Sequence, residues 1–148
     1  MKEVQEKLSE TEYHLLRLKD TIDDKNNFKH EINAFIVSAQ SIVSIINRRY
    51  KHLDGFKGWF DNYTKGNDLL TFFRTQRNLT VHEKTITPTA DVILRINEYL
   101  LSGKTESSTE YRWYYDGFDD IDALSLSKKY LEEIERFITK VYSKFGET

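Results

Sequence analysis

The chain has 148 residues, of which 39% are hydrophobic, 31% charged and 14% aromatic, and its formal net charge is -2. This length suits a single domain over residues 1–148, and the apolar content suffices for a packed core, which excludes a disordered chain. There is no cysteine, so disulfides and thiolate metal sites are excluded and a cytoplasmic protein is expected. No apolar run is long enough to span a membrane, and the slight acidity means that any nucleic-acid binding requires a local basic patch.

Apolar residues that recur at intervals of three and four predict two helices in the first third of the chain. One stripe covers residues 4–22 and a broader one covers residues 28–46, and this spacing places each set on one face of a helix. The connection over residues 23–27 is short and polar, which favours an antiparallel pair of helices. Asp54 and Gly55 are expected to stop the second helix.

The middle of the chain predicts a link and a third helix. Residues 55–60 are rich in Gly and aromatic residues and read as an irregular link. Asn67 or Asp68 can cap the helix that follows. This helix is expected to fade near residues 82–84, because β-branched residues accumulate there and Pro88 cannot continue a helix.

The last third of the chain predicts a β-hairpin and a final helix. Apolar residues alternate with polar ones over 92–96 and 111–115, with a Ser-, Thr- and Gly-rich stretch at 102–109 between them. Residues 91–101 also fit one face of a helix, so strand and helix remain alternatives there. Residues 124–145 restore the helical spacing. The prediction is a mainly α fold, a four-helix bundle of up-and-down type with a β-hairpin between the third and last helices.

One short segment carries candidate chemistry, Arg77-Asn78-Leu79-Thr80-Val81-His82. An Arg, a polar residue after it, and a His after four intervening residues resemble the signature of the HEPN superfamily. The resemblance implies a dimer of helical bundles. It also implies membership of a group in which many proteins are metal-independent ribonucleases, found as toxins or in defence, while others bind nucleotides or protein partners without known catalysis.

The residue types fit RNA cleavage without a metal. His82 can accept the proton of a 2′-hydroxyl, because an imidazole titrates near neutral pH. Arg77 can stabilise the pentavalent phosphate, because a guanidinium stays charged and matches two phosphate oxygens. The product would carry a 2′,3′-cyclic phosphate. The resemblance implies that Asn78 orients this pair or contacts the substrate.

Helix geometry restricts how Arg77 and His82 can meet. Five residues correspond to about 140° of rotation on an ideal helix, so the two residues would not share a face. Either the helix bends or ends between them, or a twofold dimer brings the motif of one chain beside that of the other. Both arrangements predict that isolated chains are poor catalysts.

A structural explanation of the motif stands beside the catalytic one. Arg and His residues near a helix C-terminus commonly bind the terminal carbonyls and interact favourably with the helix dipole. The alternative function is therefore a non-catalytic interaction or nucleotide-binding module on a dimeric scaffold. The partners expected under the two functions are a second copy of the chain, RNA, and an antitoxin or other protein.

Further basic residues are candidates for substrate binding. Arg74 and Lys84 flank the motif, and Arg48, Arg49 and Lys51 form a cluster near the end of the second predicted helix. Such a cluster can hold a phosphate backbone. It also lies where a helix end favours cations, which explains it without any ligand.

No cofactor or metal is expected. Asp116, Asp119, Asp120 and Asp122 lie close together, but their spacing fits no calcium loop, and acidic residues before a helix are common caps. The histidines lack the spacing of a zinc site. The aromatic residues over 111–115 are assigned to the core or to a dimer contact.

Overall fold

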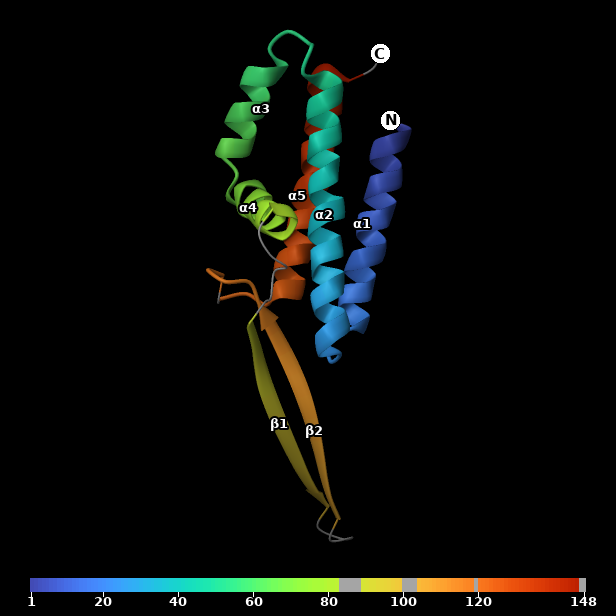
Figure 1. Ribbon diagram of the computed structural model, residues 1–148, viewed down its shortest axis with the longest axis vertical. Helices are drawn as coiled ribbons and strands as arrows, with labels where there is room; N and C mark the ends of the chain where they lie inside the picture. The colour runs from blue at the N-terminus through green and yellow to red at the C-terminus, as the bar shows by residue number, and fades with distance from the viewer. Residues whose placement is uncertain (83–88, 100–103, 119, 147–148) are drawn as a thin grey trace.

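The computed structural model describes residues 1–82, 89–99, 104–118 and 120–146, except for the side chains of residues 79–110. The helices are α1 (Lys2–Asp20), α2 (Lys25–Tyr50), α3 (Phe56–Lys65), α4 (Asp68–His82) and α5 (Ala123–Phe145), and the strands are β1 (Thr89–Tyr99) and β2 (Lys104–Tyr114) (Figure 1). The mainly helical class is confirmed, with one helix more than predicted in the described part of the chain. No helix in that part combines the length and the apolar character needed to cross a membrane.

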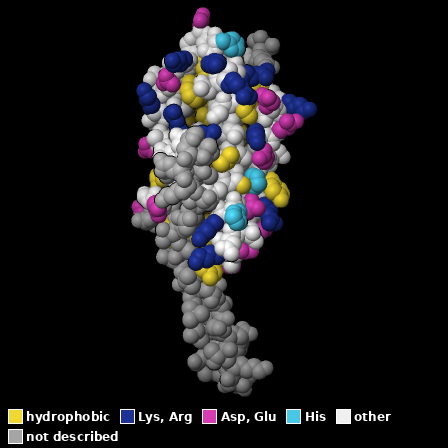
Figure 2. Space-filling model, viewed as in Figure 1, with side chains coloured by type: hydrophobic (Ala, Val, Ile, Leu, Met, Phe, Trp, Pro, Cys, Tyr) yellow, Lys and Arg dark blue, Asp and Glu magenta, His cyan; other side chains and the backbone are white. Residues whose placement is uncertain are grey.

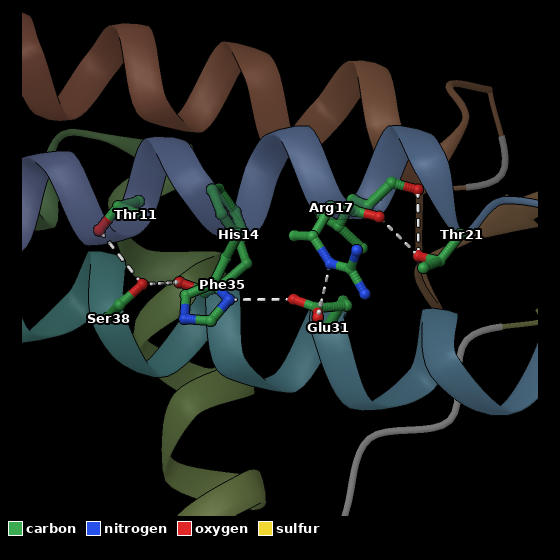
Figure 3. A network of polar contacts seen from close by, with 8 residues as sticks. Thr11, His14, Arg17, Thr21, Glu31, Phe35 and Ser38 are labelled. Carbon is green, nitrogen blue, oxygen red and sulfur yellow. Dashed lines mark hydrogen bonds and ion pairs between the residues drawn. The ribbon is translucent and has the colours of Figure 1, made fainter.

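Helices α1 and α2 form the predicted antiparallel pair, tied together by side-chain contacts (Figure 3). The buried Thr11 hydroxyl donates to Ser38 Oγ at 3.2 Å. Further along α1, His14 Nδ1 lies 2.9 Å from one oxygen of Glu31, and Arg17 Nε donates to the other at 3.4 Å. Residues later in α1 contact residues earlier in α2, which confirms the antiparallel arrangement.

The core is centred on α2 and α5 and is rich in aromatic rings. Phe73 of α4 stacks on Tyr130 of α5, with ring centroids 3.9 Å apart and planes 2° from parallel. The Tyr130 hydroxyl donates to Gln40 Oε1 of α2 at 2.7 Å, so the polar atom of a fully buried ring has a partner. This contact set joins three helices through one side chain.

Helix α3 corrects the prediction of an irregular link at residues 55–60. Gly55 has a φ of +77° and precedes the helix, a conformation that favours glycine. Trp59 and Tyr63 of α3 pack against Phe137 of α5, with centroid distances of 6.1 and 5.5 Å. The helical spacing of these aromatic residues outweighs Gly58, whose cost in a helix is only about 1 kcal/mol. The prediction was wrong because it weighed the glycines above the spacing.

The strands form a two-stranded antiparallel sheet in which Thr89 pairs with Tyr114 and Tyr99 with Lys104. Residues 89–99, for which strand and helix were alternatives over most of their length, form β1. Residues 104–109, expected in the connection, belong to β2, so that expectation was wrong. The two strands extend away from one end of the helices (Figure 1).

The base of the sheet is attached to the helices through β2. Trp113 stacks on Phe28 with centroids 4.5 Å apart, and its indole nitrogen donates to the Ile22 carbonyl at 2.8 Å. Just after β2, the buried Tyr115 hydroxyl lies 2.9 Å from Ser127 Oγ. Both rings are buried, so the assignment of these aromatic residues to the core is confirmed at Trp113 and Tyr115.

Candidate functional site

The start of α4 positions the motif, because a cap and a buried carboxylate fix it. Asn67 Oδ1 accepts a hydrogen bond from the backbone N–H of Leu70 at 3.1 Å, which makes Asn67 the cap. The Asn67 amide donates to Glu133 Oε1 of α5 at 2.7 Å. One of the two predicted capping residues is therefore confirmed, and it also ties α4 to α5.

Glu133 joins three helices although only 6% of it is exposed. The same oxygen that accepts from Asn67 accepts the Tyr63 hydroxyl of α3 at 2.7 Å, and Arg136 donates to the other oxygen. Burial, followed by the hydrogen bond to Glu133, raises the pKa of Tyr63 above its usual value. Three donors satisfy the buried carboxylate, which favours a fixed geometry for α3 and α4 on α5.

Arg77 and Asn78 lie near the C-terminal end of α4. Arg77 is half-buried and Asn78 is exposed, and Arg77 Nη1 donates to Asn78 Oδ1 at 3.4 Å, a long hydrogen bond. Among the described residues, the Arg77 side chain donates this one hydrogen bond. Its acceptor is a side chain and not a carbonyl at the helix end. The helix-end explanation of the motif therefore gains no support from Arg77.

The end of α4 bears on how Arg77 and His82 can meet. Helix α4 continues to His82, so the arrangement in which the helix ends between the two residues is wrong. On a regular helix the two positions lie about 140° apart around the axis. The side chain of His82 and the whole of Lys84 lie outside the described residues.

Positive charge is concentrated in the part of the chain that surrounds α4. Residues 44–78 contain seven Lys and Arg and three Asp, a formal charge of +4, although the whole chain carries -2. Figure 2 shows Lys and Arg side chains gathered over the upper half of one face, where α2 ends and α3 lies. Arg48, Arg49 and Lys51 are exposed there, and Arg48 lies 3.9 Å from Glu3 of α1. The segment over residues 44–78 is therefore locally basic, although Glu3 of α1 lies beside Arg48.

A hollow of about 350 Å³ lies between α2, α3 and α4, and we call it the α4 pocket. Its apolar lining includes Val43, Phe60 and Leu70, and its polar lining includes Asn47, Lys65 and Arg74. Of the predicted substrate-binding residues, the structure brings Arg74 to this pocket. Lys65 was missed by sequence reasoning, because no local pattern distinguishes it from other exposed lysines.

The acidic cluster after β2 has a structural role at one of its members. Asp122 Oδ1 accepts a hydrogen bond from the Ser125 backbone N–H at 2.9 Å and caps α5. Asp119 lies outside the described residues. Among the described residues, no group of three or more His, Asp or Glu is placed to hold a metal ion.

Comparison of the chain with protein-family models, with curated proteins and with solved structures gave no match.

Proposed function

We propose that the chain is a HEPN-like, metal-independent endoribonuclease whose site is built from two copies, with Arg77 of one beside His82 of the other. The single observation that carries the two-copy arrangement is the continuation of α4 through His82. Because a regular helix turns the two positions about 140° apart, the continuation of α4 favours a pairing between two chains over one within a chain. A twofold axis places each motif beside its counterpart.

Two further observations support RNA as the substrate. Arg77 and Asn78 are accessible at the end of α4, and the surrounding residues 44–78 carry a formal charge of +4. A phosphate backbone is attracted to such a patch even when the whole protein is acidic.

The proposed reaction is an in-line transfer within the RNA strand. The 2′-oxygen forms a bond to phosphorus, the bond from phosphorus to the 5′-oxygen breaks, and His82 takes the 2′-hydroxyl proton. The leaving 5′-oxygen takes a proton from solvent, and Arg77 stabilises the charge on the phosphate oxygens. The products are a 2′,3′-cyclic phosphate end and a 5′-hydroxyl end.

The test is cleavage of a mixed-sequence RNA in EDTA by the wild-type chain and by Arg77→Ala and His82→Ala. Lys19→Ala is the matched control, because it removes an exposed cation from α1. Wild type and Lys19→Ala should cleave, and each motif variant should not. If folded wild-type protein leaves the RNA intact, the ribonuclease proposal is wrong.

Mixing the two inactive variants tests the two-copy site. A mixed dimer has two sites, and one of them keeps both Arg77 and His82. Random exchange of chains makes half of the dimers mixed. About a quarter of the wild-type activity should therefore return. Cleavage by wild type with no recovery on mixing would place the site within one chain.

The second candidate function is a non-catalytic module that binds a nucleotide or a partner. The α4 pocket supports it, because a pocket can hold a ligand whether or not the motif is catalytic.

A further inference from the structure

The α4 pocket has the size and lining of a binding site for part of a nucleic-acid strand. Its volume is about 350 Å³, at the lower end of the range for small-molecule pockets, which suits a single nucleoside. Val43 and Leu70 are nearly fully buried and Phe60 is half-buried, so the floor is apolar and Phe60 supplies most of the apolar surface that a base can contact. Apolar and aromatic surfaces hold the faces of bases with little regard to sequence.

The rim of the pocket carries cations that have no partner among the described residues. Lys65 and Arg74 are exposed, and neither side chain makes an ion pair or hydrogen bond with another described residue. A Lys and an Arg at one rim offer a point charge and a planar fork to phosphate oxygens.

The remaining polar groups favour a nucleotide over a bare anion. Asp61 also lines the pocket, and its carboxylate repels a free phosphate but accepts a hydrogen bond from a ribose hydroxyl or a base N–H. The exposed Asn47 amide can donate and accept at a base edge. The hydroxyls of Thr64 and Thr71 already donate to the carbonyls of residues 60 and 64, so the amide and the carboxylate carry the recognition.

The pocket lies on the same helix as the motif. Arg74 precedes Arg77 by three residues, and residues three apart are neighbours on a helix surface. A nucleotide held at Arg74 therefore places the next phosphate of the same strand toward Arg77.

We propose that the α4 pocket binds one nucleotide of a single RNA strand, with the base on the apolar floor and its phosphate at Lys65 and Arg74. The inference rests on the proposed ribonuclease function for its substrate, and it adds a subsite that the motif itself does not contain.

The test measures binding of a fluorescently labelled 2′-O-methyl RNA dodecamer, which lacks the attacking 2′-hydroxyl and so reports binding without cleavage. The variants are Lys65→Ala with Arg74→Ala, and Ser44→Phe, which fills the pocket from an exposed lining residue. Lys57→Ala is the matched control, because Lys57 is an exposed cation of α3 that does not line the pocket. Circular dichroism establishes that each variant is folded.

The double variant should bind the dodecamer at least about tenfold more weakly. The slope of log affinity against log salt concentration should fall by about 0.7, the contribution of one phosphate on a single strand. Ser44→Phe should weaken binding without changing that salt dependence, and Lys57→Ala should change affinity by less than about twofold. The proposal would be overturned if the loss of affinity per cation removed were the same for the double variant as for Lys57→Ala. Competition by inorganic phosphate as strong as competition by the four nucleoside monophosphates would also overturn it.

The outcomes separate this inference from the ribonuclease proposal. If the dodecamer binds through the pocket and ordinary RNA is not cleaved, the subsite stands and catalysis is wrong. If ordinary RNA is cleaved and the double variant leaves KM unchanged, catalysis stands and the subsite is wrong.

Discussion

The hydrogen bond between Tyr63 and Glu133 allows a quantitative test of how α3 and α4 are held on α5. Tyr63→Phe removes only a hydroxyl that donates at 2.7 Å to a carboxylate of which 6% is exposed. A hydrogen bond to a charged acceptor contributes about 1.5 to 3 kcal/mol. Because Tyr63 is only half-buried, we expect the lower end, a loss of about 1.5 kcal/mol in the free energy of unfolding.

The second half of the cycle removes the acceptor. Glu133→Ala should cost more, about 3 kcal/mol or above, because the Asn67 amide and Arg136 lose the same buried partner. In the Glu133→Ala background, Tyr63→Phe should cost close to nothing. The expected coupling energy between the two substitutions is therefore about 1.5 kcal/mol.

Urea unfolding measures each corner of the cycle, and fluorescence is a suitable probe because Trp59 stacks on Tyr63 with centroids 5.2 Å apart. Tyr13→Phe serves as the control, since Tyr13 is 57% exposed and its change should stay within about 0.5 kcal/mol. A coupling energy below about 0.3 kcal/mol would refute the reasoning, because additive effects mean that the two groups do not interact.

Two other expectations concern stability. Burial raises the pKa of Tyr115 and Tyr130, which, unlike the half-buried Tyr63, are fully enclosed. At these two positions the folded chain keeps two protons that the unfolded chain loses near the usual tyrosine pKa of about 10. The free energy of unfolding should then fall above about pH 10 by up to about 2.7 kcal/mol per pH unit, and urea titrations across this range that stay flat would contradict it. Asp122→Ala should cost about 1 kcal/mol by removing the cap of α5, whereas Asp122→Asn keeps an acceptor and should cost less; equal losses of thermal stability would argue against the cap.

The predictions that succeeded depended on local patterns with a direct physical cause. The stripes over residues 4–22 and 28–46 required helices with one buried face, and the short polar connection required that they run antiparallel. Asn67, one of two predicted caps, and Asp122, one of four acidic residues before the last helix, do cap their helices, because Asn and Asp side chains accept hydrogen bonds from nearby backbone N–H groups.

The predictions that failed depended on contacts between distant residues. The aromatic spacing of α3 could not be weighed against its glycines from the sequence alone, because the packing of Trp59 and Tyr63 on Phe137, more than seventy positions along the chain, decides between them. The boundary of β2 was misplaced because residues 104–109 have weak strand preferences and are ordered by their pairing with β1.

For the candidate site, the sequence alone determined which residues are proposed to carry the chemistry, because Arg77, Asn78 and His82 stand out as a motif without any knowledge of the fold. Tertiary structure decided what surrounds them. The anchoring of the start of α4 on Glu133 and the meeting of Lys65 with Arg74 at one pocket both arise where separate helices pack together. Such neighbours are set by the packing of buried faces against one another, and no spacing along a single helix encodes them.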